Sequence, residues 1–302
     1  MAPQLRNVIR TPSPELRRNE AVVVVTPYST GCCMALEMQQ RGYQLICLWS
    51  HGFSEVMKTH VPGTCLGKLS YSVELDQAES VPVTAKLVEQ VAAENGWKII
   101  ACLCGGEAGV DLTDALSEYM GLLSNGTGIA NRRDKKVQQE LVRATGMRAV
   151  RQSGGSRLED VDSFLHTESY PVIVKPVDSA GSDGVKLCRT YEEARAHFLY
   201  LMNEHDMVNG GTCQEALCQE FLKGKEYVVD HASRDGVHKT CMLWNYDKRK
   251  ANGADFVYYG MIPIDSESPE AKLLIPYARG VLDALGVANG PSHGEFILTE
   301  DG

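Results

Sequence analysis

The chain has 302 residues, of which 43% are hydrophobic and 23% are charged, and its formal net charge is -9. This composition is typical of a globular protein with two or three lobes, and it excludes a disordered chain. An acidic chain without a basic stripe argues against a dedicated nucleic-acid-binding protein, although nucleotide binding needs only a local basic site.

The N-terminal residues and the cysteines indicate the compartment. No apolar run approaches the roughly 18 residues of a membrane span, so no membrane association is predicted. Residues 1–18 are polar and lack the apolar core of a secretory signal, and we interpret them as a flexible arm. None of the ten cysteines forms a C-x-x-C pair and most lie in apolar runs, which predicts reduced core cysteines and a cytoplasmic location.

The first lobe, residues 19–125, begins with a strand, a helix and a second strand. Val22–Val25 is typical of a buried strand, Cys32–Arg41 of a helix, and Gln44–Trp49 of the next strand. Together they form a βαβ unit, which predicts a Rossmann-like parallel α/β sheet. The loop Thr26–Gly31 would lie where such sheets bind ligands, but it lacks G-x-G-x-x-G and predicts no dinucleotide site.

Glu107 lies at a second strand-to-helix turn of this lobe. It follows the expected strand Trp97–Cys104 and precedes the expected helix Asp111–Met120. A carboxylate at this position either contacts a substrate amine or is a solvated or N-capping side chain, and the sequence leaves these interpretations open. The turn residues Ser124–Gly128 then mark the end of the lobe.

The next subdomain, residues 126–218, opens with a basic helix start. A helix is expected over Asn131–Thr145. Its first turn carries four cations, Arg132, Arg133, Lys135 and Lys136. Positive charge at a helix N-terminus opposes the helix macrodipole, so a bound anion would remove the conflict. A solvated basic face is the alternative.

A strand, a loop and a second strand follow at residues 172–187. Val172–Val174 is expected to be a buried strand with Lys175 at its end, and Val185–Leu187 to pair with it as a hairpin. The flap between them contains Ser179, Ala180, Gly181, Ser182 and Gly184. Glycine lets backbone N–H groups approach phosphate oxygens closely, and lysine supplies a point charge for the same oxygens. An ordinary Gly/Ser turn with a surface lysine is the alternative.

The last subdomain, residues 219–302, opens at the end of another apolar strand. Backbone groups of Glu220, Phe221 and Leu222 could pair with a purine edge, and Glu226 could bind ribose hydroxyls. A plain hairpin with a charged turn is the alternative.

Four further elements are expected around these stretches. Arg148–Gln152 is expected to be a short strand, and Thr190–Glu193 is a capping box that starts a helix. Met242–Gly253 is expected to join a strand to a basic loop that contains Lys248 and Arg249. Glu295 is expected on a short strand near the end of the chain.

Taken in order, these stretches resemble the ATP-grasp superfamily. The resemblance rests on R-x-D-K at a helix start, a strand lysine with a Gly/Ser flap, Q-E-F-L-x-G-x-E and H-x-E-F. These motifs occupy Arg132–Lys135, Lys175–Gly184, Gln219–Glu226 and His293–Phe296. The chain is most similar to the L-amino acid ligase and carnosine-synthase-like branch, over residues from about 20 to 302. The resemblance implies an α/β N-terminal lobe followed by an α+β ATP-grasp domain.

The resemblance implies ATP and Mg²⁺ as cofactors. Lys135 and Lys175 would hold the ATP phosphates, and the flap from Ser179 to Gly184 would close on them. The segment Glu220–Leu222 would contact adenine, with Glu226 on the ribose.

The implied activity is that of an ATP-dependent carboxylate–amine ligase. Glu295 would bind Mg²⁺, and Lys248 or Arg249 would face the γ-phosphate or the acyl phosphate. The carboxylate becomes an acyl phosphate, and an amine then displaces phosphate to form an amide. The partners would be small carboxylates and amines such as amino acids. Whether the protein forms a homodimer is not predicted.

The end of the chain departs from the family pattern. The family has a second acidic residue, followed two positions later by asparagine, on a strand after the turn that here is Glu300–Gly302. We therefore expect a C-terminally incomplete ATP-grasp domain. A catalytically incomplete ATP-binding protein or gene fragment is the alternative to the ligase, and an α/β interaction domain that binds no nucleotide is a third hypothesis.

Overall fold

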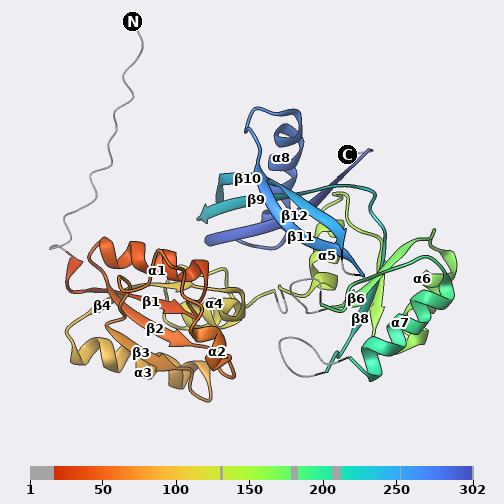
Figure 1. Cartoon of the computed structure of the whole chain (residues 1–302). Coiled ribbons are helices and arrows are strands. Elements are labelled where there is room, and N and C mark those ends of the chain that lie inside the picture. The colour runs from red at the N-terminus through yellow and green to blue at the C-terminus, as the bar shows by residue number, and fades with distance from the viewer. Residues whose placement is uncertain (1–16, 130–131, 178–182, 206–211, 252, 301–302) are drawn as a thin grey trace, which may run out of the picture. The chain divides into compact units, whose positions relative to one another are not determined.

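The computed structural model describes residues 17–129, 132–177, 183–205, 212–251 and 253–300, without the side chains of residues 254–256 (Figure 1). The chain divides into two compact units, Met1–Gly128 and Ile129–Gly302. The turn before Gly128 stays with the first unit because its polar groups bond to the preceding helix. Ser124 Oγ donates to the carbonyl of Asp114 at 2.9 Å, and Thr127 N donates to Glu118 at 3.2 Å.

The first unit is built on a four-stranded sheet in the order β3-β2-β1-β4. Its strands are β1 (Glu20–Val25), β2 (Gln44–Trp49), β3 (Val73–Asp76) and β4 (Lys98–Cys104). Every pairing in this sheet is parallel. The predicted parallel α/β sheet is therefore confirmed.

Helices cover both faces of this sheet. They are α1 (Thr30–Gln40), the short α2 (Glu55–Lys58), α3 (Val81–Glu94) and α4 (Val110–Tyr119), which a 3-10 turn at Glu107–Gly109 precedes. The apolar side chains of α3 and α4 pack on one face of β1, and those of α1 pack on the other.

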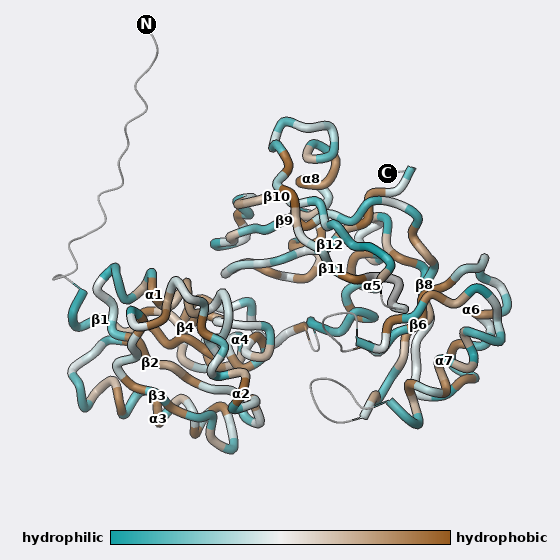
Figure 2. Tube along the Cα trace, viewed as in Figure 1, coloured by the Kyte–Doolittle hydropathy of each residue, from teal (hydrophilic) through white to brown (hydrophobic). Residues whose placement is uncertain are grey.

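The valine run of β1 explains why its two faces are both buried. Ala21, Val23 and Val25 belong to the core that α3 and α4 share, whereas Val22 and Val24 belong to the core under α1. All five side chains are 0% or 1% exposed. Each buried valine contributes roughly 1.5–3 kcal/mol relative to an exposed one. Figure 2 shows hydrophobic residues along the strands of this sheet, as burial on both faces requires.

The second unit contains two antiparallel sheets. The first has the order β5-β8-β6-β7. Its strands are β5 (Gln152–Gly155), β6 (Val172–Pro176), β7 (Lys186–Cys188) and β8 (Ala216–Glu220). Helices α6 (Leu158–Thr167) and α7 (Tyr191–Asn203) pack on the face that carries Val172 and Val174.

The second sheet of this unit has the order β11-β10-β9-β12. Its strands are β9 (Gly224–Arg234), β10 (Val237–Ala251), β11 (Ala254–Pro263) and β12 (Gly290–Thr299). Helix α8 (Pro269–Ala284) packs on one face, and helix α5 (Lys135–Ala144) precedes both sheets in the chain.

Several local expectations are confirmed and others are wrong. The β6–β7 hairpin forms, and Thr190 caps α7 by accepting a hydrogen bond from Glu193 N at 3.2 Å. The strand expected over Arg148–Gln152 instead begins at Gln152. The basic loop expected after Met242 is wrong, because β10 continues through Ala251.

The hairpin alternative for Leu217–Asp230 is also wrong. Strands β8 and β9 belong to different sheets, so residues 221–223 carry the chain from one sheet to the other.

Candidate functional site

Lys175 is the first element of the candidate site. Its strand β6 alternates, so Val172 and Val174 face helices α6 and α7 while Lys175 points to the opposite face. Lys175 pairs in register with Leu217 on β8 and is half-buried. The lysine is therefore held on the face of its sheet that these helices do not cover.

The second sheet supplies a face of charged and aromatic side chains. Tyr227 and Val229 of β9, and Leu243 of β10, turn toward α8, so their neighbours point to the other side. That other side carries Glu226, Asp230, Tyr246, Lys248, His293 and Glu295, which we call the polar face. The period-two alternation of β9, β10 and β12 thus separates core from candidate site.

Electrostatic interactions join Lys175 to the polar face. Burial, together with the nearby positive charges of Lys135 and Lys248, lowers the pKa of Lys175 to about 8. Glu295 and Glu226 act in the opposite direction and do not cancel the effect. The fold therefore brings together three lysines and two carboxylates, all five of which are residues that the sequence singled out.

The two catalytic cations proposed from the sequence lie in different surroundings. Lys248 Nζ lies 2.5 Å from Glu226 Oε1 and 5.0 Å from the centre of the Tyr246 ring. Arg249 instead pairs with Asp247 at 2.6 Å and stacks on Tyr259, and its side chain is 61% exposed. Of the two cations, Lys248 belongs to the polar face and pairs with Glu226.

The carboxylate of Glu220 is bound by two arginines of the protein. It accepts ion pairs from Arg148 at 2.7 Å and Arg151 at 2.8 Å, and it is 7% exposed. Its backbone N–H also donates to the Arg151 carbonyl at 3.0 Å. Only other backbone groups of Glu220, Phe221 and Leu222 stay as candidates for an adenine contact.

Helix α5 starts four residues later than expected, and its N-cap is Asp134. The Asp134 carboxylate accepts hydrogen bonds from Lys136 N at 2.7 Å and Val137 N at 3.0 Å. A negative cap favours the helix macrodipole, so Asp134 offsets the positive charge that Lys135 and Lys136 place in the first turn.

Three of the four cations near this helix start have different partners. Lys136 Nζ donates to the Gly154 carbonyl at 3.0 Å, and Arg132 Nε donates to the Leu285 carbonyl at 2.9 Å. Lys135, at the first position of α5, is the one that influences Lys175.

Most of the predicted flap lies outside the described residues, namely Ser179, Ala180, Gly181 and Ser182. Its end at Gly184 is described and has a φ of +68°. A Cβ there would lie 2.8 Å from Pro176, so both the backbone angle and the space favour glycine. His197 of α7 lies 2.8 Å from the Gly184 carbonyl and holds this end of the loop.

A hydrogen-bonded chain on the polar face was not among the predicted site residues. Tyr246 Oη lies 3.1 Å from His293 Nε2, and His293 Nδ1 lies 2.8 Å from Asp230. Trp244 Nε1 donates to the same carboxylate at 2.7 Å. The signal was present in sequence, because His293 and Asp230 share the alternation that carries Glu295 and Glu226.

The surroundings of these hydrogen-bonded side chains shift the pKa values of two of them. Burial alone would raise the pKa of Asp230, but hydrogen bonds from His293 and Trp244 outweigh it and lower the pKa. Burial and the carboxylates of Glu295 and Glu226 raise the pKa of Tyr246 to about 12. Tyr246 is therefore a neutral hydrogen-bonding group at physiological pH.

The donor set fits a polyanion accompanied by a divalent cation. Three lysines against two carboxylates leave a local excess of positive charge, which suits a triphosphate. Among the described residues, no group of three or more His, Cys, Asp or Glu side chains could hold a metal on its own. Mg²⁺ is commonly bound by one or two protein carboxylates together with substrate phosphates. The carboxylate of Glu295 could therefore be the ligand that the protein contributes.

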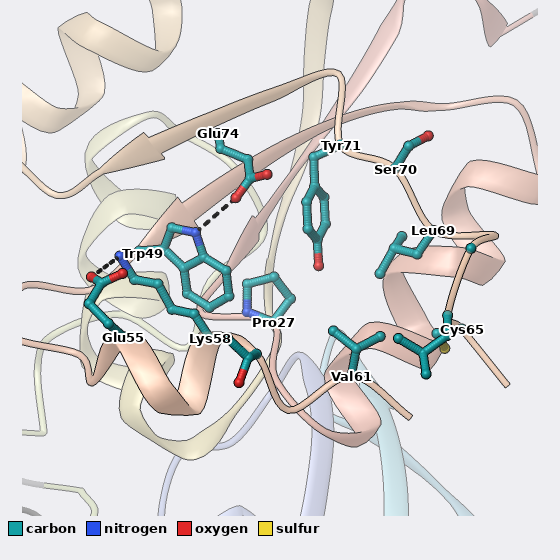
Figure 3. A pocket seen from close by; sticks show the side chains of 13 residues that line it. Pro27, Trp49, Glu55, Lys58, Val61, Cys65, Leu69, Ser70, Tyr71 and Glu74 are labelled. Atoms are coloured by element: carbon teal, nitrogen blue, oxygen red, sulfur yellow. Dashed lines mark hydrogen bonds and ion pairs between the residues drawn. The ribbon is translucent and has the colours of Figure 1, made fainter. Parts of the chain in front are cut away.

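The first unit contains a separate cavity of about 550 Å³ (Figure 3). Its polar end is formed by Glu74, which accepts a hydrogen bond from Trp49 at 3.2 Å, and by Lys58. Val61 and Leu69 form an apolar end. None of the lining residues is a predicted nucleotide ligand. Glu107 is exposed at the start of the 3-10 turn, whose N-cap residue is Gly106, and the N-cap residue of α4 is Gly109.

Comparisons with known proteins agree with this architecture. Residues 168–302 match the ATP-grasp domain family. Dapdiamide A synthase of Enterobacter agglomerans is 28% identical over 290 residues, which cover 95% of this chain and 66% of that protein. No helix among the described residues is long and apolar enough to cross a membrane.

Two solved structures share the fold. L-amino acid ligase from Bacillus licheniformis has a TM-score of 0.69 at 18% identity, covering 94% of this chain and 65% of that one. The biotin carboxylase domain of Hydrogenobacter thermophilus 2-oxoglutarate carboxylase, solved with MgADP, has a TM-score of 0.64 at 16% identity, covering 93% and 61%. This chain therefore spans about two thirds of the length of these relatives.

Proposed function

We propose, from the premise that this chain belongs to the ATP-grasp superfamily, that it is an ATP-dependent carboxylate–amine ligase. The substrates are a small carboxylate and a small amine, with amino acids as the first candidates. The similarity to a dapdiamide synthase and to the fold of an L-amino acid ligase supports this choice of substrates.

The observation that carries the proposal is the convergence of Lys135, Lys175 and Lys248 beside Glu226 and Glu295. Phosphoryl transfer depends mainly on positioning and on neutralising charge, and a half-buried lysine cluster does both. In this proposal Lys135 and Lys175 bind the phosphates, Glu226 binds the ribose, and Glu220–Leu222 offer backbone groups to adenine.

Two groups act on the reacting end. Glu295 would hold Mg²⁺, which when bound would neutralise negative charge on the phosphates. Lys248 faces the transferred phosphoryl group and stabilises the negative charge that develops there. The carboxylate substrate becomes an acyl phosphate, and the amine then displaces phosphate to give the amide.

Tyr246, His293 and Asp230 give this face a fixed geometry. Each member bonds to the next at 3.1 Å or less, so the strands β9, β10 and β12 are tied together beside Glu295. Fixed positions of the reacting groups are what this chemistry requires.

The test is ADP release by the full chain with Mg-ATP and mixed L-amino acids, with the amide product identified by mass spectrometry. Amino-acid-dependent ADP release with a matching dipeptide mass supports the ligase. ATP binding without any turnover supports the catalytically incomplete ATP-binding protein instead. Absence of an ATP-induced thermal shift would leave the interaction-domain hypothesis.

A further inference from the structure

Two cysteines of the first unit lie in contact although they are far apart in sequence. Cys33 lies on α1, and Cys65 lies on the segment between α2 and β3. Their sulfur atoms are 3.6 Å apart, and Thr64 Oγ1 lies 3.9 Å and 3.8 Å from the two sulfurs. All ten cysteines of the chain lie in the described part and are reduced.

The two thiols differ in their access to solvent. Cys33 is exposed, whereas Cys65 is 1% exposed. Burial, reinforced by Cys33 itself, raises the pKa of the Cys65 thiol. A small oxidant in solution therefore reaches Cys33 first and finds Cys65 behind it.

The neighbouring Cys32 is held differently. Its thiol is 1% exposed and donates to the Pro27 carbonyl at 3.3 Å, and its pKa is also raised by burial. Cys32 therefore supplies a matched control: it is adjacent in sequence to Cys33 and is buried like Cys65.

We propose that Cys33 and Cys65 form a reversible thiol–disulfide modification site that is oxidised by small-molecule disulfides of the glutathione class. The Cys33 thiolate attacks one sulfur of the oxidant, which forms a mixed disulfide and releases one small thiolate. The Cys65 thiolate then attacks the Cys33 sulfur, forms the intramolecular bond and releases the second small thiolate. Two protein thiols lose their protons and are oxidised, and the oxidant is reduced to two thiols.

The geometry allows this second step. A disulfide requires the sulfurs to approach from 3.6 Å to about 2.05 Å, and Cys65 lies between α2 and β3, outside regular helix and strand. In a reducing compartment a bond of this kind is regulatory rather than structural.

The bond would act on the cavity of the first unit. Cys65, Leu66 and Leu69 line that cavity, and Cys65 lies beside Val61 and Leu69 in Figure 3. A link from Cys65 to α1 fixes this wall and closes a long chain loop, which restricts the unfolded state. The melting temperature of the first unit should rise by roughly 5–10 °C.

The experiment uses the full chain in defined mixtures of reduced and oxidised glutathione, followed by alkylation and peptide mapping. We expect a cross-linked peptide pair that contains Cys33 and Cys65. Cys241, which is also exposed, should take only a glutathione adduct. The variant Cys65→Ser should stop at the adduct on Cys33, and Cys32→Ser should still form the cross-link.

Three results would overturn the proposal. The first is a wild-type chain that stops at the Cys33 adduct under conditions in which Cys241 is fully modified. The second is a disulfide that joins Cys33 to Cys32 instead of to Cys65. The third is an unchanged yield in denaturant, because a folded-state site should form this pair about tenfold more readily than the unfolded chain does. The wild-type mapping decides the matter even where a buried Cys65 variant fails to fold.

Discussion

Lys175 holds a positive charge in a place where folding disfavours it. Burial and two neighbouring lysines lower its pKa to about 8 from an ordinary value of 10.5. A triphosphate would supply the missing negative charge. In the proposed function, the Lys175 cation therefore lowers the stability of the free protein and binds a phosphate when ATP is present.

Lys175→Met should make the chain more stable at pH 7 and a poorer ATP binder. Because the folded pKa is depressed, the unfolded chain holds more protons between pH 8 and 10.5, and wild-type stability rises with pH over that window. The variant lacks this rise and should gain roughly 1–3 kcal/mol in the free energy of unfolding at pH 7. Denaturant titrations at pH 7 and pH 10.5 measure it.

The ATP affinity of Lys175→Met should fall about tenfold to a hundredfold, as expected for a lost charge-assisted bond. Wild-type affinity should itself decrease as the pH rises above about 8, because Lys175 loses its proton there. Calorimetry across this range tests both. A variant that binds ATP as the wild type does would remove Lys175 from the site.

Lys248 and Arg249 form a matched pair of adjacent cations. Lys248 belongs to the polar face and pairs with Glu226, whereas Arg249 pairs with Asp247. Lys248→Ala should lower kcat at least tenfold through lost charge stabilisation, and Arg249→Ala should change kcat less than about twofold. Equal losses in steady-state ADP release would contradict the assignment of Lys248.

At the scale of elements, polar groups at strand and helix ends fix the framework of the second unit. Glu220 ends β8 and ties the segment around Arg148 and Arg151 to it. Tyr277 of α8 donates to the Arg148 carbonyl at 2.5 Å, so the same cluster reaches the helix of the other sheet. The passage from β8 to β9 is thereby anchored on the side opposite Lys175.

Glu220→Ala should lower the free energy of unfolding by about 1–3 kcal/mol, because a buried acceptor with two cationic partners is lost. Arg157→Ala is the control, since its ion pair with Asp160 is a surface pair with Arg157 72% exposed. That change should stay within about 0.5 kcal/mol. Denaturant unfolding compares them, and similar small effects would show that the cluster is dispensable.

The start of α5 offers a second contrast between framework and site. Asp134→Ala should lower the free energy of unfolding by about 0.5–2 kcal/mol through the lost cap. Lys135→Ala should instead weaken ATP binding with little change in stability, because Asp134 caps the helix and Lys135 lies near Lys175. Thermal melts with and without Mg-ATP separate the two. A loss of stability in Lys135→Ala and a loss of ATP binding in Asp134→Ala would contradict both assignments.

At the scale of the whole molecule, the predicted nucleotide site lies within one of the two units. Every predicted nucleotide residue lies in the second unit, whereas the first contains the cavity and the Cys33–Cys65 contact. The chain has three tryptophans, of which Trp49 and Trp97 lie in the first unit and Trp244 in the second.

ATP should therefore raise the melting temperature of the second unit selectively. A ligand at about 100 times its Kd stabilises the folded state by about 2.7 kcal/mol. In a Trp49→Phe, Trp97→Phe variant, fluorescence reports Trp244 alone, and its transition should move upward with Mg-ATP. A shift seen only when Trp49 and Trp97 are present would place the nucleotide in the first unit.

The sequence by itself determined the features that depend on neighbouring residues. The Val22–Val25 run and the helix after it indicated the parallel sheet of the first unit, because two-sided burial needs a continuous apolar strand. Turn and cap chemistry likewise indicated the β6–β7 hairpin and the Thr190 cap. The ordered motifs indicated the superfamily.

The tertiary structure alone decided which distant groups meet. It separated β8 from β9 into two sheets, directed Lys248 rather than Arg249 toward Glu226, and used the Glu220 carboxylate to bind arginines. It also assigned the α5 cap to Asp134. Local periodicity states which side chains share a face of one strand, but strand pairing between remote segments states which faces meet. Such pairings are set by the packing of the whole unit, and no short stretch contains them.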